Sequence, residues 1–185
     1  MLYCIQVEPT GEVKTEREIR AIVPEDLCLS CFHLTRRMHK NYHGRYRDVT
    51  ERFLPSYIFI DTPDLEALYW ALKKVPTLTK VVGFREWQPD LNGFDGFGAL
   101  NEEEEAFIRQ LAMGHGATTP GLVDISMVEV KEGNTVEIVS GPLKGLEGYV
   151  KKINLHRRQA EVEIDLFRQK HTVYLGIEIM NRVNG

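Results

Sequence analysis

Four residues in the N-terminal half have types and spacing found in zinc sites. Cys28 and Cys31 form a Cys-x-x-Cys pair, and His39 and His43 follow as a His-x-x-x-His pair. Thiolate and imidazole groups are preferred zinc ligands. However, the loop between the pairs is shorter than in structural zinc sites, and in a strand the two cysteines would point to opposite faces. We therefore expect two structural cysteines, no metal and no other cofactor.

No group of residues suggests catalysis. The glycine-rich stretch 93–98 lacks the strand–turn–helix frame of a phosphate-binding loop. The acidic run 102–105 falls at the start of a predicted helix, where negative charge is stabilising in any protein. The sequence therefore predicts a protein that is not an enzyme.

Cationic side chains gather in a first region, the segment 36–52. His43 and Gly44 near its centre predict the tip of a hairpin. Phosphate attraction, with stacking by Tyr42 and Tyr46, would let this hairpin bind a DNA strand or a DNA duplex. A solvated charged loop is the alternative. The predicted DNA-binding residues are Arg36, Arg37, Lys40, Arg45 and Arg47.

A second cationic region comprises loops between predicted strands near the C-terminus. The turn 154–158 has no evident need for its cations other than binding. Lys and Arg side chains in such loops can contact RNA phosphates, and arginine can also stack on bases. Charge that serves only solubility is the alternative. The predicted RNA-binding residues are Lys144, Lys151, Lys152, His156, Arg157, Arg158, Arg168, Lys170 and His171.

The composition is that of an ordinary globular protein, with 43% hydrophobic and 27% charged residues among 185. The formal net charge of −4 excludes a general polyanion binder, so any nucleic-acid contact must be local. No apolar run reaches the roughly 18 residues of a membrane span. Three cysteines, an odd number, fit a reducing compartment. We expect a cytoplasmic monomer that does not contact membranes.

The N-terminal part predicts strands and helices in the order β-α-β-β-α-β, followed by another helix. The strands are expected at 2–7, 27–34, 53–60 and 80–84, and 88–99 is expected to be a loop. The first helix is expected at 12–23. Thr62 is expected to cap the second helix, and a capping box of Asn101 and Glu104 to start the third. This order is typical of an α+β sandwich.

The C-terminal part predicts five short strands, at 135–139, 149–153, 160–166, 172–175 and 177–180. Between the first two lies a turn in which Pro142 fixes φ and Gly141, Gly145 and Gly148 can take positive φ. Short strands joined by tight turns are typical of a small β-barrel.

Several motifs resemble those of the NusG family. Gly141-Pro-Leu-Lys-Gly145, with Gly148 and the alternation after it, resembles the KOW motif. Three further stretches resemble the N-terminal domain of the family in their order and spacing. They are Arg52-Phe-Leu-Pro-Ser-Tyr-Ile-Phe-Ile60, Val75-Pro76 to Val82-Gly-Phe84, and Leu100-Asn-Glu-Glu-Glu-Glu-Ala106. The resemblance implies an RNP-like NusG N-terminal (NGN) domain at 1–113, a flexible linker at 114–125, and an SH3-like KOW barrel at 126–185.

The resemblance also implies partners. NusG-family proteins bind RNA polymerase through the N-terminal domain, on the clamp helices of the largest subunit, and recruit a second partner through the KOW domain. The matching motifs put the polymerase contact on Tyr3, Phe53, Leu54, Tyr57 and Phe84, and the alternative is that these residues form the core. A transcription elongation and antitermination factor is therefore expected.

Two departures from the family pattern refine this expectation. Ser56 stands where the family has glycine, and Phe167-Arg-Gln-Lys170 replaces a glycine-containing turn. Together with the basic loops, they resemble a specialised paralogue of the LoaP type, whose KOW domain is associated with a nascent RNA hairpin. The alternative is a KOW-containing RNA-binding protein that acts on ribosomes or structured RNA without polymerase.

Overall fold

The chain divides into two compact units in a computed structural model that describes residues 1–78, 97–113, 120–132, 135–166 and 169–180. The first unit comprises residues 1–34 and 54–105, and the second comprises residues 35–53 and 106–185. Helices and several sheets confirm the α+β class. The predicted strand 80–84, Phe84, Arg168 and linker residues 114–119 lie outside the described residues. The predicted domain boundaries therefore stay a prediction.

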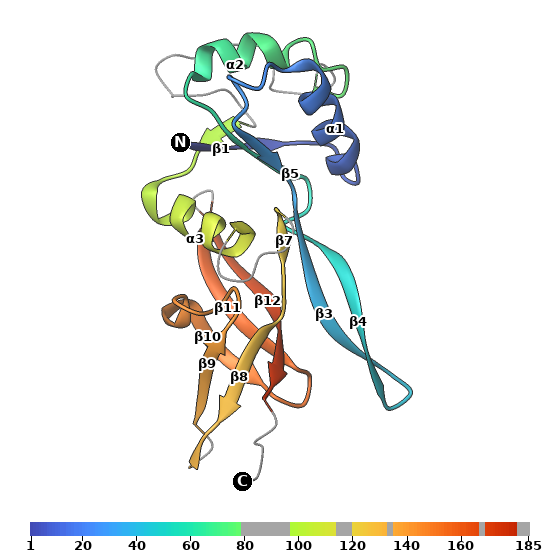
Figure 1. Ribbon diagram of the computed structural model, residues 1–185, viewed down its shortest axis with the longest axis vertical. Coiled ribbons are helices and arrows are strands. Elements are labelled where there is room, and N and C mark those ends of the chain that lie inside the picture. The colour runs from blue at the N-terminus through green and yellow to red at the C-terminus, as the bar shows by residue number, and fades with distance from the viewer. Residues whose placement is uncertain (79–96, 114–119, 133–134, 167–168, 181–185) are drawn as a thin grey trace. The chain divides into compact units, whose positions relative to one another are not determined.

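The first unit contains a four-stranded antiparallel sheet in the order β2-β5-β1-β6. Its strands are β1 (Leu2–Gln6), β2 (Ser30–Phe32), β5 (Tyr57–Asp61) and β6 (Phe97–Ala99). Helices α1 (Glu12–Ile22) and α2 (Leu65–Leu72) lie on one side of β1 and β5 (Figure 1). The predicted loop at 88–99 is therefore wrong for its last three residues, which pair with β1.

The core of this unit lies between the sheet and the two helices. Ile58 and Ile60 of β5 join Ile19 of α1 and Leu68 of α2 in one apolar cluster. Phe59 belongs to the opposite face, where its ring stacks on that of Phe32 with centroids 5.6 Å apart. The alternation predicted for this strand is confirmed.

The strand predicted at 53–60 begins later, at Tyr57. Leu54 and Ser56 have φ angles of 48° and 70°, so the backbone turns before β5. Glu12 holds this turn, because its Oε1 accepts a hydrogen bond of 2.7 Å from the Ser56 N–H. A positive φ costs glycine less than serine. This explains physically why glycine suits the position of Ser56.

The helix caps agree only partly with expectation. Asp64, and not Thr62, caps α2, because its carboxylate accepts a 2.9 Å hydrogen bond from the Ala67 N–H. The capping box of α3 (Glu102–Met113) is confirmed. There Asn101 and Glu104 exchange backbone-to-side-chain hydrogen bonds of 2.9 Å.

In the second unit, the segment 36–52 forms the predicted hairpin of β3 (Leu34–Tyr42) and β4 (Arg45–Phe53). The predicted tip is confirmed, since His43 and Gly44 have φ angles of 51° and 83°. Strand β7 (Leu122–Val123) pairs in parallel with β3. The last part of the predicted linker is thus paired to the hairpin.

The C-terminal residues form a five-stranded sheet in the order β10-β11-β12-β8-β9. Its strands are β8 (Ser126–Val130), β9 (Val136–Ser140), β10 (Val150–Asn154), β11 (Gln159–Leu166) and β12 (Gln169–Ile179). The prediction of two short strands at 172–175 and 177–180 is wrong, because β12 runs through both. Gly176 lies within this strand. The β3 backbone passes close to it, because a Cβ at Gly176 would lie 2.6 Å from the Arg37 carbonyl oxygen.

The turn after β9 has the predicted conformation. The Lys144 N–H donates to the Gly141 carbonyl at 3.0 Å, which places Pro142 at the second position of the turn. Gly141 has a φ of 94°, and a Cβ there would lie 2.6 Å from Ser126 Cα. Only glycine satisfies both constraints. The turn buries Leu143 and Leu146 in the core of this unit.

None of the helices in the described part of the chain has the length and apolar character needed to cross a membrane.

An ion pair between α1 and the residue after β2 should make the first unit sensitive to pH. Glu16 Oε2 lies 2.6 Å from His33 Nδ1. The hydrogen bond to Glu16 raises the pKa of His33 above 6.5. Burial alone would raise the pKa of Glu16, but hydrogen bonds from His33 and Arg20 outweigh it and lower that pKa below 4.5.

We expect the pair to stabilise the fold most between about pH 4.5 and 6.5. The His33 contribution is complete below its unfolded pKa and is lost as pH rises through the raised folded pKa. The Glu16 contribution is lost as pH falls through the lowered folded pKa. His33→Ala should therefore reduce the melting temperature more at about pH 5.5 than at about pH 8.5. His43→Ala, at the exposed hairpin tip, is the matched control. Equal losses for His33→Ala at both pH values would contradict the prediction.

Candidate nucleic-acid interface

The β3–β4 hairpin is held against the C-terminal sheet by polar contacts within the second unit. Arg37 donates to both carboxylate oxygens of Asp124 at 3.1 Å. Arg36 donates to the Tyr174 carbonyl at 2.7 Å. On β4, the Tyr46 hydroxyl donates to the His156 carbonyl at 2.5 Å. These contacts place the hairpin beside the loop between β10 and β11.

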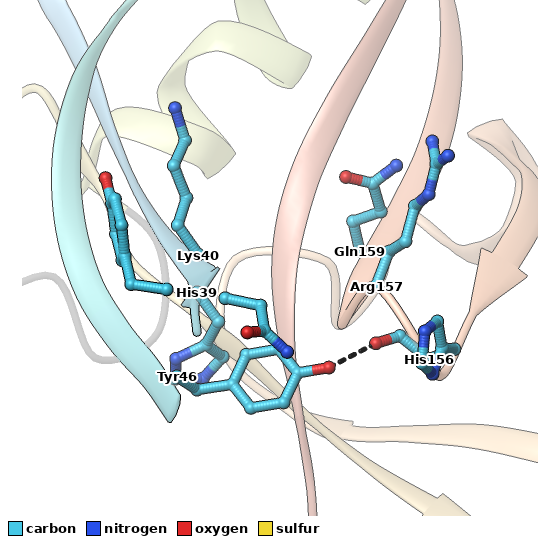
Figure 2. Close-up of a pocket in the computed structure, with 8 residues that line it drawn as sticks. His39, Lys40, Tyr46, His156, Arg157 and Gln159 are labelled. Atoms are coloured by element: carbon cyan, nitrogen blue, oxygen red, sulfur yellow. Dashed lines mark hydrogen bonds between the residues drawn. The ribbon is translucent and has the colours of Figure 1, made fainter. Parts of the chain in front are cut away.

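A groove of about 350 Å³ lies between the hairpin and this loop. Figure 2 shows Lys40 and Tyr46 on one side and Arg157 and Gln159 on the other, with the hydrogen bond from Tyr46 to His156 running between the two sides. The complete lining is His39, Lys40, Asn41, Tyr42, Tyr46, His156, Arg157 and Gln159. The structure thus unites one residue of the predicted DNA-binding set with two of the predicted RNA-binding set.

A smaller hollow adjoins the groove and shares Arg157 and Gln159 with it. It adds Lys152 and Asn154 of β10, Glu161 of β11 and Tyr174 of β12. The two hollows together present tyrosine rings, side-chain amides and cations. Rings stack on unpaired bases, amides hydrogen-bond to base edges, and cations bind phosphates.

Lys152 and Arg157 are the cations of this surface that are available to a ligand. Both side chains are exposed, and neither forms an ion pair with any residue that the structure describes. The loop geometry fixes Arg157, because its backbone N–H donates to Asn154 Oδ1 at 2.9 Å. Arg45 and Arg47 on β4 are likewise exposed and, among the described residues, unpaired.

Other predicted nucleic-acid residues are occupied by protein contacts. Arg158 forms a 2.6 Å ion pair with Glu178, and its guanidinium lies 4.5 Å from the centre of the Tyr46 ring. Arg36 pairs with Glu51 at 3.3 Å. Lys40 also pairs with Glu51, and this hydrogen bond raises the pKa of Lys40. Lys40 therefore faces the groove with its charge largely compensated.

The remaining predicted RNA contacts also have partners. Lys170 and Lys151 share Glu163, at 3.2 and 3.6 Å, and the hydrogen bond from Lys170 is the main cause of the lowered pKa of Glu163. Lys144 donates to the Ile138 carbonyl at 2.9 Å. The His171 ring lies 3.1 Å from the Leu166 carbonyl.

The histidines of the zinc motif considered above belong to the β3–β4 hairpin. His39 has its ring nitrogens 2.6 Å from Asp48 Oδ1 and from Glu178 Oε2, which links both hairpin strands to β12. His43 is at the hairpin tip. In the described ranges, no three His, Cys, Asp or Glu side chains are arranged to hold a metal ion.

The predicted polymerase-contact residues differ in exposure. Tyr3 is 8% exposed and belongs to the core cluster between the sheet and the helices. Phe53 and Leu54 are also buried. Tyr57 is half-buried, and this partial burial raises the pKa of its hydroxyl. Of the described members of this set, Tyr57 is the one with accessible surface.

Two groove residues, Asn41 and Gln159, were missed by sequence reasoning. Asn41 is in β3, where its Oδ1 accepts a 2.8 Å hydrogen bond from the Gly44 N–H. Gln159 begins β11. No local pattern marks either residue, because the groove joins positions that are far apart in the sequence.

Comparisons with known proteins agree with this architecture. The family model of the KOW motif matches residues 132–165, which include β9, β10, the loop of Arg157 and all but the last residue of β11. "Transcription termination/antitermination protein NusG" of Borreliella burgdorferi is 22% identical over 190 residues, covering 98% of this chain and 97% of that protein. The chain is a NusG-family factor.

Two further similarities involve other members of the NusG family. The protein of the same name from Streptococcus pyogenes serotype M1 is 22% identical over 133 residues, covering 72% of this chain and 66% of its own length. A solved structure titled "Domain interaction in Thermotoga maritima NusG" aligns with a TM-score of 0.49 and 20% identity, covering 95% of this chain and 92% of that chain.

The two adjacent arginines of the KOW loop should differ in their effect on stability. Arg158→Ala removes the Glu178 ion pair and the contact with Tyr46, so we expect a loss of about 1 kcal/mol in the free energy of unfolding. Arg157→Ala is the matched control and should leave stability within about 0.5 kcal/mol. Chemical denaturation measures both. An equal loss for the two variants would show that Arg158 does not anchor the hairpin.

Proposed function

We propose that this NusG-family factor regulates transcription elongation by binding RNA polymerase through its first unit and nascent RNA through the groove of its second unit. The observation that carries the RNA proposal is the groove itself. Arg157 in the groove and Lys152 in the adjoining hollow, both without an ion pair within the described part of the chain, lie beside tyrosine rings and side-chain amides. The relatives named transcription termination/antitermination proteins support the role in transcription. The factor would promote processive elongation and read-through of terminators, as a specialised paralogue of the LoaP type.

The size of the groove favours an unpaired nucleotide over a duplex. A volume of about 350 Å³ accommodates about one nucleotide, whereas a double helix would contact only its rim. Tyr42 is 47% exposed and offers a ring on which a base can stack. The RNA element would therefore present a loop or bulge to this site. The exposed Arg45 and Arg47 are the proposed contacts for non-template DNA.

Holding two ligands on one chain would act by effective concentration. Nascent RNA and the factor are both attached to the same polymerase. RNA that dissociates from the factor therefore stays close to it and binds it again as an intramolecular partner. A modest number of available cations in the groove then suffices, because the polymerase contact supplies the remaining affinity. Such a factor would work in the cytoplasm, without a cofactor and without chemistry of its own.

RNA binding should depend on Lys152 and Arg157 and not on total charge. The double variant Lys152→Ala with Arg157→Ala should weaken binding of a hairpin with an unpaired loop. It should also reduce the slope of log affinity against log salt by about 0.7 for each phosphate that the protein no longer neutralises. Lys14→Ala with Arg17→Ala removes the same charge from α1 of the first unit and should change neither quantity. Equal effects of the two double variants would show that Lys152 and Arg157 contribute to RNA binding only through the total charge of the protein.

Polymerase binding should depend on Tyr57. A half-buried tyrosine can anchor an interface while its hydroxyl stays hydrated, so Tyr57→Ala should cost about 2 kcal/mol or more, at least ten-fold in affinity. Trp70→Ala is the control, because Trp70 is an aromatic residue of α2 that is 58% exposed and outside the proposed contact. Pull-down and titration with polymerase measure both variants, after circular dichroism has shown that they are folded.

One outcome would contradict the role of Tyr57, and another would favour the rival function. A folded Tyr57→Ala protein that binds polymerase as tightly as the parent would remove Tyr57 from the contact. A parent protein that binds RNA but not polymerase would favour an RNA-binding protein acting on ribosomes or structured RNA.

A further inference from the structure

Two cysteines of the first unit meet at the turn between α1 and β2. Cys31 lies in β2, is 1% exposed and pairs with Ile60. Cys28 is half-buried and precedes the strand, where its N–H donates to the Pro24 carbonyl at 3.1 Å. The expectation that the two thiols diverge across a strand is therefore wrong. Cys28 lies in the turn, where its side chain packs against the core cluster that contains Cys31 and its thiol donates to the Ser30 carbonyl at 3.7 Å.

The surroundings give the two thiols different roles. The hydrogen bond from Cys31 lowers the pKa of Cys28 in spite of its burial, and the nearby Arg20 guanidinium adds to this effect. The same hydrogen bond, together with burial, raises the pKa of Cys31. Arg20 is held in place because it donates to the Cys31 carbonyl and pairs with Glu16 at 3.0 Å. Cys28 is thus the more acidic of the two thiols, and Cys31 is the less acidic one.

We propose that Cys28 and Cys31 form a dithiol site that a hydroperoxide oxidises reversibly to an intramolecular disulfide. The proposal is independent of RNA and polymerase binding, because it concerns residues that neither function uses. It rests on the packing of Cys28 against the cluster that holds Cys31, and on the access that Cys28 retains at the turn while Cys31 is buried. A Cys-x-x-Cys pair with one accessible, more acidic thiol and one buried thiol is the arrangement that favours this chemistry.

The reaction balances in two steps. The Cys28 thiolate attacks one oxygen of hydrogen peroxide and breaks the O–O bond, which gives a Cys28 sulfenic acid and, after protonation, water. Cys31 then loses its proton, and its sulfur attacks the Cys28 sulfur, releasing the sulfenic oxygen as a second water. The first step removes the negative charge of Cys28 and so removes a cause of the raised pKa of Cys31. A small-molecule dithiol reverses the reaction by thiol–disulfide exchange.

The third cysteine provides an internal control. Cys4 lies in β1, is 4% exposed, and burial raises the pKa of its thiol well above the ordinary value. It should therefore resist both oxidation and alkylation in the folded chain. We expect maleimide to modify Cys28 at least about ten-fold faster than Cys4 in the reduced protein.

The test uses the full folded chain, hydrogen peroxide as the oxidant and mass spectrometry after cleavage by trypsin. Cleavage after Arg20 and Arg36 places both cysteines in the fragment 21–36, whereas Cys4 falls in the fragment 1–14. The expected result is a fragment 21–36 lighter by about 2 Da, the two hydrogens lost on disulfide formation. This fragment should take up no maleimide until a dithiol reduces it. Fragment 1–14 should stay reduced at the same peroxide concentration.

Two variants assign the roles. In Cys28→Ser the fragment should keep its Cys31 thiol, because the accessible nucleophile is gone. In Cys31→Ala the oxidised Cys28 should be trapped by dimedone as a sulfenic acid. Cys28→Ser changes a half-buried side chain, so it remains informative even if Cys31→Ala fails to fold. The proposal is overturned if fragment 21–36 stays reduced while a free cysteine peptide is oxidised, or if Cys31 of Cys28→Ser is oxidised as fast as in the parent.

Discussion

The close approach of β3 to β12 at Gly176 is the contact on which the second unit depends. The Arg37 carbonyl occupies the space that a Cβ at Gly176 would need. With no side chain there, the hairpin backbone can pack directly on β12, and Arg36 and Arg37 reach their partners on either side of it. The Tyr46–His156 hydrogen bond joins the same hairpin to the loop between β10 and β11 (Figure 2). One side of the groove is therefore carried by a hairpin that packs on β12 at a residue without a side chain.

Ion pairing divides the cations of this unit into two classes. Arg37 and Arg158 direct their charge to Asp124 and Glu178, and they position the hairpin and the loop. Lys152 and Arg157 keep their charge for a ligand. This division leaves uncompensated positive charge at the proposed RNA surface of a chain whose formal net charge is −4.

The two faces of β5 in the sheet of the first unit have different neighbours. Ile58 and Ile60 are committed to the helices, so only the other side of β5 can offer Tyr57 to a partner. The strained turn at Ser56, held by Glu12, determines where that strand begins. The position of the proposed polymerase contact thus follows from local backbone geometry, and Cys28 and Cys31 lie at another edge of the same sheet.

The sequence by itself determined the features that have local causes. Helix α1, the capping box of α3, the hairpin tip at Gly44 and the turn at Gly141 were predicted correctly, because periodicity, capping and positive φ act within a few residues. Tertiary structure decided which charges are available to a ligand, that β12 continues through Gly176, and that Asn41 and Gln159 line one groove. It also decided that Cys28 lies in a turn before β2, since the hydrogen bond from its N–H to the Pro24 carbonyl replaces the start of the strand predicted at 27–34. These outcomes depend on long-range contacts, which no short stretch of sequence encodes alone.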